Sequence, residues 1–144
     1  MAIDRTFVIP AKPATVFEYL TDPARARTWQ GSLIEVELDP PGPMRQGTRI
    51  RETRRFLGRT IESTVDVTEF EPDTLFGGVV RVRPSPWTFS YRLEEAGGAT
   101  RVHARLQGKP GGLFRLGANV ALRVAEQELA KDFATLAEVV GGST

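Results

Sequence analysis

The sequence predicts an α+β fold in which one long C-terminal helix faces a curved antiparallel sheet made by the same chain. About 28 residues, Leu113–Val140, run without a proline, and apolar side chains recur among them every three or four positions, the period of one helix face. Residues 33–107 instead hold short alternating segments separated by turns rich in glycine and proline, which is typical of strands. The helix would be about 42 Å long and would end at Gly141-Gly142. Its apolar stripe comprises Leu122, Ala125, Leu129, Phe133, Leu136 and Val140.

The composition is that of an ordinary globular protein. Of 144 residues, 40% are hydrophobic and 26% are charged, so we expect a single domain spanning residues 1–144. With no cysteine and one histidine, disulfides and cysteine sites are excluded, and we expect neither a metal nor a cofactor. The net charge of +1 gives no reason to expect nucleic acid as a partner. Residues 1–6 lack an apolar signal core and no run is long enough for a transmembrane segment, which predicts a cytoplasmic protein.

The first third of the chain predicts a strand, two short helices and a second strand. Ile3–Ile9 alternates apolar and polar side chains. Pro13 suits the first turn of a helix, and Asp22 is the N-cap expected for a second helix that runs through about Trp29. The second strand is indicated by alternating apolar residues at Ile34, Val36 and Leu38.

Five further strands follow a loop forced by the prolines of residues 40–43. The first two form a hairpin around Leu57-Gly58, and Gly77-Gly78 suggests a bulge in the third. Together with the first two strands they make seven. The expected bounds are Thr48–Phe56, Arg59–Phe70, Thr74–Arg83, Trp87–Glu94 and Thr100–Gln107.

With this order of elements, the chain resembles the START and birch-pollen-allergen superfamily, which has the helix-grip or SRPBCC fold. The resemblance is greatest to its polyketide cyclase/dehydrase-like branch. The resemblance covers nearly the whole chain. It implies a seven-stranded sheet wrapped around the C-terminal helix, and functions that range from lipid carriage to aromatase/cyclase and hydratase activity. The motifs that carry it are residues 9–17 (IPAKPATVF), 20–23 (LTDP) leading to Trp29, 47–49 (GTR), 67–72 (VTEFEP), 91–93 (YRL), 98–102 (GATRV) and the helix around 129–136.

A cavity between sheet and helix is the expected ligand site. A helix is only about 10 Å wide, so it cannot fill the concave face of a strongly curved sheet, and the remaining space suits an apolar ligand. The same residues could also be plain core. The expected lining is Phe56, Ile61, Val65, Trp87, Phe89, Tyr91, Val102, Ala104, Leu106, Leu122, Leu129 and Phe133.

Polar residues in the cavity-facing phase are the candidates for chemistry. Glu52 and Arg54 lie on the same face of their strand as Ile50 and Phe56. There they could anchor a ligand carbonyl or carboxylate, or Glu52 could act as an acid–base carboxylate. A bulge that turns one of them outward, or a purely structural ion pair, is the alternative explanation. The Tyr91 hydroxyl is a second candidate donor to a ligand oxygen, and Ser63 is a third polar candidate.

Several charged residues are expected to face solvent instead. His103 lies between Val102 and Ala104 and therefore out of phase with the inward set, which argues against a catalytic role. Six arginines fall within residues 45–59, but three of them share the outward phase opposite acidic residues of the next strand. Cross-strand ion pairs explain them better than a nucleic-acid patch. These residues are Arg49, Arg51, Arg55, Glu62 and Asp66.

A second apolar stripe lies almost opposite the first at the start of the long helix. It consists of Leu113, Leu116, Val120 and Val124. A kink at Gly117 or Asn119, or a separate short helix over the cavity mouth, would account for it. So would a contact with a membrane surface or a second subunit, which makes a homodimer a possible assembly.

Three functions are compatible with these features. Binding or transport of a small hydrophobic ligand, such as a lipid, a polyketide or another aromatic or isoprenoid-like molecule, is the leading hypothesis. The alternatives are a polyketide cyclase or dehydratase that uses Tyr91 and Glu52 as proton-transfer groups, and a protein-interaction module.

Overall fold

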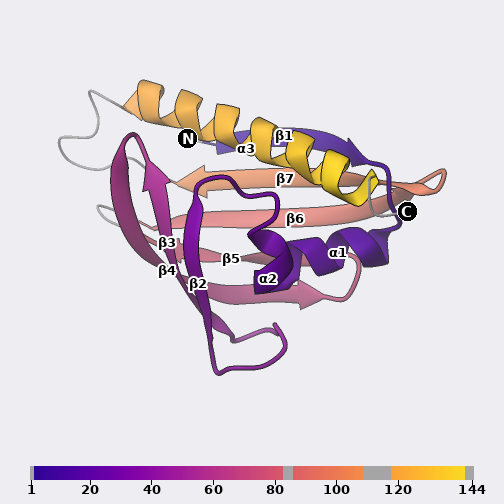
Figure 1. Ribbon diagram of the computed structural model, residues 1–144, viewed down its shortest axis with the longest axis horizontal. Helices are drawn as coiled ribbons and strands as arrows, with labels where there is room; N and C mark the ends of the chain where they lie inside the picture. The colour runs from indigo at the N-terminus through magenta and orange to yellow at the C-terminus, as the bar shows by residue number, and fades with distance from the viewer. Residues whose placement is uncertain (1, 83–85, 109–117, 142–144) are drawn as a thin grey trace.

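Seven strands form one antiparallel sheet in the order β1-β7-β6-β5-β4-β3-β2. The computed structural model describes residues 2–82, 86–108 and 118–141. In Figure 1, α3 lies along β1 and β7, while β2, β3 and β4 curl round the opposite side of the sheet. The elements are β1 (Ala2–Ile9), α1 (Pro13–Thr21), α2 (Pro23–Ala26), β2 (Leu33–Asp39), β3 (Arg49–Phe56), β4 (Arg59–Glu71), β5 (Leu75–Arg81), β6 (Trp87–Ala96), β7 (Ala99–Gly108) and α3 (Ala118–Gly141).

The α+β helix-grip fold that the sequence predicts is confirmed. A tight hairpin joins β3 to β4 through Leu57 and Gly58, whose φ angles are 52° and 74°. Positive φ at both central residues matches the right-handed twist of the flanking strands. Gly97 and Gly98 turn β6 into β7 in the same way, with φ of 59° and 87°.

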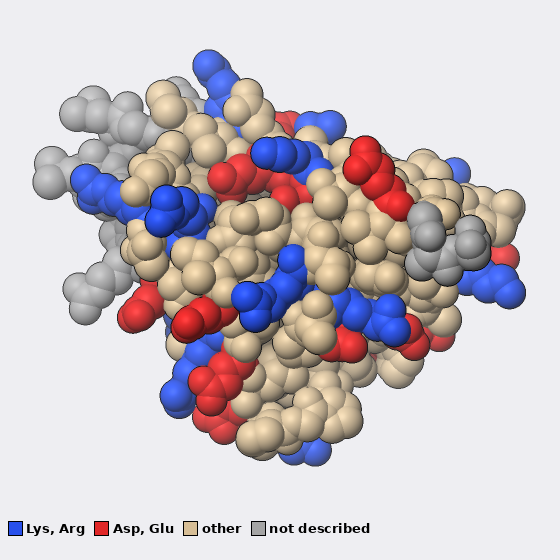
Figure 2. All heavy atoms as spheres, viewed as in Figure 1, with Lys and Arg blue, Asp and Glu red and all other residues tan. Residues whose placement is uncertain are grey.

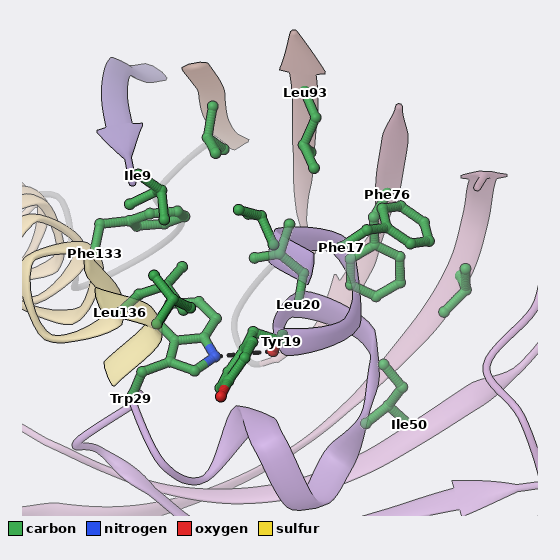
Figure 3. Close-up of a cluster of buried hydrophobic side chains, with 14 of the residues drawn as sticks. Ile9, Phe17, Tyr19, Leu20, Trp29, Ile50, Phe76, Leu93, Phe133 and Leu136 are labelled. Atoms are coloured by element: carbon green, nitrogen blue, oxygen red, sulfur yellow. Dashed lines mark hydrogen bonds between the residues drawn. The ribbon is translucent and has the colours of Figure 1, made fainter. Parts of the chain in front are cut away.

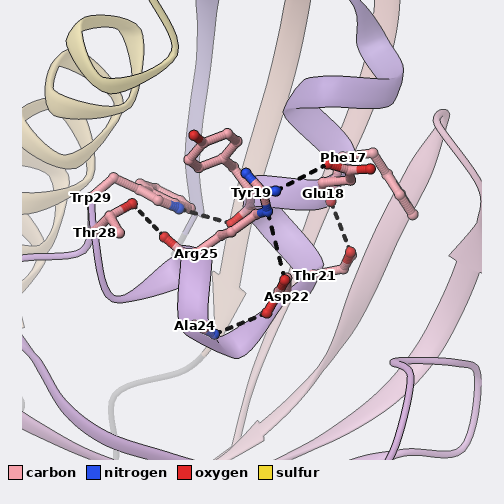
Figure 4. A network of polar contacts seen from close by, with 9 residues as sticks. All are labelled: Phe17, Glu18, Tyr19, Thr21, Asp22, Ala24, Arg25, Thr28 and Trp29. Carbon is pink, nitrogen blue, oxygen red and sulfur yellow. Dashed lines mark hydrogen bonds and ion pairs between the residues drawn. The ribbon is translucent and has the colours of Figure 1, made fainter. Parts of the chain in front are cut away.

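The second helix is shorter than predicted. Asp22 caps it as expected, accepting a hydrogen bond from the Ala24 N–H at 3.0 Å. However, α2 ends at Ala26, and Trp29 follows in a turn. The indole of Trp29 donates to the Tyr19 carbonyl of α1 at 2.9 Å, which fastens this turn to the first helix (Figure 4). The tertiary contact, rather than helical periodicity, therefore positions the tryptophan.

The start of β2 corrects the predicted alternation. Ile34 is 38% exposed, whereas Leu33 is buried. The pairing with β3 shifts between Leu33 and Glu35, so a bulge places Leu33 in the inward phase and leaves Ile34 out of it. Val36 and Leu38 keep their predicted inward phase.

The predicted bulge near Gly77-Gly78 lies in the neighbouring strand. The register between β4 and β5 shifts between Val67 and Glu69, opposite the two glycines. The glycines are needed for close approach: a Cβ at Gly77 would lie 2.7 Å from the Phe89 carbonyl oxygen, and one at Gly78 would overlap the Asp66 carbonyl oxygen. Small residues in β5 thus let the strands around the bulge come together.

The helix α3 covers the described part of the predicted long helix. The predicted segment before Ala118 lies outside the described residues. The phenyl ring of Phe133 stacks on Phe7 of β1 with ring centroids 4.5 Å apart, and meets Trp29 edge-on at 5.2 Å. Phe133, Leu136 and Val140 are almost completely buried. Figure 3 shows this half of the helix packed against Ile9, Trp29 and the residues of α1.

Candidate functional site

The concave face of the sheet is packed at one end and accessible at the other. Among the predicted lining residues, four are buried in the core: Val65, Val102, Ala104 and Phe133. The other eight remain partly accessible to a water-sized molecule: Phe56, Ile61, Trp87, Phe89, Tyr91, Leu106, Leu122 and Leu129.

The same gradient runs along the helix. Leu122, Ala125 and Leu129 are partly exposed, whereas Phe133 and Leu136 are buried. We call the candidate ligand site in front of these eight partly accessible residues the concave pocket. Three of the eight, Phe89, Tyr91 and Leu129, also pack against the buried core.

Glu52 and Arg54 share the inward face of β3. Cross-strand pairing sets Glu52 opposite Val36 of β2 and Ser63 of β4, all in the phase of Ile50 and Val65. Arg54 donates from Nε to Glu52 Oε1 at 2.9 Å and from Nη2 to Oε2 at 3.2 Å. The strand is regular here, so both side chains point toward α3 and the loop before β2.

Two loop residues complete the arrangement around Arg54. Its Nη2 donates to Gln30 Oε1 at 2.5 Å, and its Nη1 donates to Ser32 Oγ at 3.2 Å. Burial alone would lower the pKa of Arg54, but the adjacent Glu52 carboxylate more than offsets this and raises it. The guanidinium therefore stays charged and ties the loop to β3.

Asp132 brings a second carboxylate to this cluster from α3. Its Oδ1 accepts a hydrogen bond from the Gly31 N–H at 3.2 Å. Burial raises the pKa of Asp132, while the Gly31 N–H and Arg54 oppose that shift. The loop of residues 30–32 is thus held from both sides, by Arg54 of the sheet and by Asp132 of the helix.

Tyr91 stands at the inner end of the concave pocket. Its ring lies 5.6 Å from Phe133 and 5.5 Å from Phe89, measured between centroids. Protein surrounds the side chain so fully that burial raises the pKa of the hydroxyl to about 12, with Arg54 opposing the shift. Yet part of its surface is accessible to a water-sized molecule. At neutral pH this hydroxyl is therefore protonated and can donate a hydrogen bond.

The charged residues expected on the outer face lie there. His103 pairs with Thr6 and Arg92 in the convex phase, with its Nδ1 3.1 Å from Thr6 Oγ1. Asp66 accepts from Arg81 at 2.6 Å and Arg49 at 3.0 Å, and those two hydrogen bonds lower its pKa. On the helix-bearing side of the molecule, which Figure 2 shows, basic and acidic side chains are intermingled as well.

Two hollows beside the sheet do not coincide with the concave pocket. One, of about 670 Å³, lies against β2, β3 and β4 and includes Glu52 and Ser63, but most of its lining is polar and belongs to the convex phase. The other, of about 220 Å³, is lined mainly by polar residues of β4, β6 and β7, with Phe89 at its edge. Neither has the apolar lining that a hydrophobic ligand requires.

Sequence reasoning missed three residues of the polar cluster. Asp132 carried a usable signal, because it stands three residues after Leu129 and four before Leu136 and so interrupts an apolar helix face. Gln30 and Ser32 carried none, because they lie in a loop without periodicity.

Part of the second apolar stripe, Leu113 and Leu116, lies outside the described residues. Of the rest, Val120 is 58% exposed and Val124 is partly buried.

No helix in the described part of the chain is long and apolar enough to cross a membrane. Within the same residues, no group of three or more histidine, aspartate or glutamate side chains is placed to hold a metal ion.

Known structures with the same fold are similar over the full chain. TTHA0849 from Thermus thermophilus superposes with a TM-score of 0.82 at 15% identity, with 100% of both chains covered. Ara h 8.0201 gives a TM-score of 0.71 at 15% identity, covering 99% of each chain. DynU16, from the dynemicin biosynthetic locus, gives 0.70 at 18% identity, covering 97% of this chain and 47% of that one. At these identities the likeness establishes the fold alone.

No curated protein matches the sequence. The family whose sequence profile matches is described as polyketide cyclase / dehydrase and lipid transport, and the match extends over residues 1–141. This chain therefore belongs to the polyketide cyclase/dehydrase and lipid transport family.

Proposed function

We propose that the protein binds a small hydrophobic ligand in the concave pocket, as a carrier or a receptor. The observation that carries this proposal is the burial gradient. Eight large side chains of β3, β4, β6, β7 and α3 remain partly accessible, although other residues of the same sheet face and helix stripe are buried. Leaving so much apolar surface accessible is unfavourable by about 25 cal/mol per Å², and a ligand would remove that cost.

The family description supports the same reading, since it pairs polyketide-processing enzymes with lipid transport. Apolar side chains make up most of the pocket, and its polar groups gather at the end near Tyr91 and Arg54. This distribution is typical of sites that hold an apolar body and orient it through a few hydrogen bonds.

A neutral naphthyl-ketone dye, whose emission shifts to the blue in apolar surroundings, tests the proposal. We expect micromolar binding with a blue shift. Leu106→Trp and Leu129→Trp should each weaken binding while the protein stays folded, because overpacking costs about 1–3 kcal/mol. Val8→Trp adds the same ring at a position that is 60% exposed on the convex face, and should leave binding unchanged. Equal binding by all four proteins would place the dye elsewhere.

A cyclase or dehydratase activity is the second candidate, favoured by the family description and by the Tyr91 hydroxyl. Because its pKa is raised to about 12, this hydroxyl would act by polarising a substrate carbonyl through a hydrogen bond. Glu52 is engaged by two hydrogen bonds from Arg54, which makes it a poor general base while that pair is intact. Under this alternative, Tyr91→Phe should reduce turnover without preventing ligand binding.

A further inference from the structure

The polar end of the concave pocket offers hydrogen-bond donors that the protein itself does not use. Arginine carries five N–H groups. Arg54 directs one from Nε to Glu52, two from Nη2 to Gln30 and Glu52, and one from Nη1 to Ser32. The second N–H of Nη1 has no acceptor among the described residues. The Arg54 side chain is 30% exposed, so this N–H is open to a water molecule or to the oxygen of a ligand.

The Tyr91 hydroxyl is a second such donor. The Tyr91 side chain is partly accessible, and no hydrogen bond joins its hydroxyl to any of the described side chains or backbone groups. It lies within electrostatic range of Arg54, Glu52 and Asp132. Its ring is fixed between Phe89 and Phe133, so the hydroxyl is held in one place at the end of the apolar lining.

The charges around these donors do not favour an anion. Glu52 neutralises Arg54 through the paired hydrogen bonds, with its own side chain only 11% exposed. Asp132 adds another carboxylate on the helix side. A ligand carboxylate would therefore meet two acidic side chains against one guanidinium, in surroundings where water screens charges poorly.

Building on the proposed function, we propose that the ligand is a neutral molecule whose apolar body carries one oxygen acceptor, such as a ketone, held by Tyr91 and Arg54. The apolar body would lie toward Phe89, Leu106 and Leu129. An oxygen placed there satisfies two donors at once, whereas a pure hydrocarbon leaves both unsatisfied and a carboxylate adds a third negative charge.

Displacement of the naphthyl-ketone dye by ligands of equal chain length tests this selectivity. 2-Dodecanone should displace the dye at a concentration at least about tenfold lower than dodecanoate at pH 7.5. Tyr91→Phe should weaken the binding of 2-dodecanone by roughly 3–10-fold, the contribution of a neutral hydrogen bond. It should change the affinity for dodecanoate less. Asp132→Asn should reduce the difference in affinity between the two ligands, because it should strengthen the binding of dodecanoate.

Tyr19→Phe is the matched control. It removes the hydroxyl of the chain's other tyrosine, which is buried in α1 with Arg25 over its ring at 5.1 Å, and should change neither affinity. Equal affinity for ketone and carboxylate, or a preference that Tyr91→Phe leaves undiminished, would overturn the proposed selectivity while leaving hydrophobic binding intact. Failure of the dye and both ligands to bind the unmodified protein would overturn the proposed function as well.

Discussion

Asp132 shows how one side chain can link the stability of the fold to its ligand site. It is partly buried on α3 between the loop of residues 30–32 and the polar cluster, with Glu128 and Lys131 as its charged neighbours on the helix. Burial raises its pKa above the usual 3.8, against the hydrogen bond from Gly31 and the charge of Arg54. The ionised form is therefore disfavoured in the folded protein compared with the unfolded chain.

This shift predicts a pH-dependent effect of Asp132→Asn. An acid whose pKa is higher in the folded state destabilises the fold above that pKa. The penalty is relieved as the pH falls through the raised pKa toward 3.8, because the folded protein then takes up the proton first. The variant should exceed the unmodified protein in unfolding free energy at pH 7.5, by a margin that shrinks toward pH 4. Urea titrations across this range measure it.

Asp73→Asn provides the control, since it makes the same chemical change in the exposed turn before β5 and corrects for the altered net charge. A margin for Asp132→Asn that is constant with pH, or that grows as the pH falls, would contradict the assigned environment.

Individual site residues were predictable where strand phase decides orientation. Alternation placed Glu52 and Arg54 on the inward face, and it placed His103 on the outward face. It could not show that Arg54 would reach Gln30 and Ser32, because a loop has no period from which its side-chain directions follow. The roles of these residues in ligand binding remain predictions.

At the scale of elements, the glycine pair in β5 is the clearest constraint on the sheet. Gly78→Ala would bring a Cβ into the Asp66 carbonyl oxygen, and neither group is the end of a flexible side chain. We expect a loss of about 1–3 kcal/mol of stability, the usual cost of overpacking, seen as a lower urea midpoint. Gly31→Ala is the matched control, because its Cβ would meet only Asp132 Oδ1 at 3.9 Å. Comparable losses in both variants would show that close approach is not the cause.

Element boundaries were harder to predict than element types. Each described strand was expected, but the positions of the bulges were not. Leu33, not Ile34, faces inward at the start of β2, and the bulge beside Gly77-Gly78 lies in β4. In both cases cross-strand pairing decides which residue is skipped, and a single strand's sequence does not contain its partner's register. The second helix ends at Ala26, before Trp29, whose indole bonds to the Tyr19 carbonyl of α1.

At the scale of the whole molecule, burial differs between the two ends of the helix and of the sheet. The packed end holds Phe133, Leu136 and Trp29, all of which are buried. The other end leaves Tyr91 and Trp87 partly accessible. This division could be expected in outline, because one narrow helix cannot fill a curved sheet. The sequence could not predict which end would stay accessible, because that depends on where α1 and the turn containing Trp29 pack.

The chain's two tryptophans lie in these two parts of the molecule, which allows a direct test of the ligand site. Labelling with 5-fluorotryptophan should give two ¹⁹F resonances, assigned with Trp87→Phe. Titration with 2-dodecanone should shift the Trp87 resonance in a saturable manner, since its ring faces the concave pocket. The Trp29 resonance should move little, since its side chain is 3% exposed within the core. A saturable shift confined to Trp29, or no saturable shift of either resonance, would contradict ligand binding in the concave pocket.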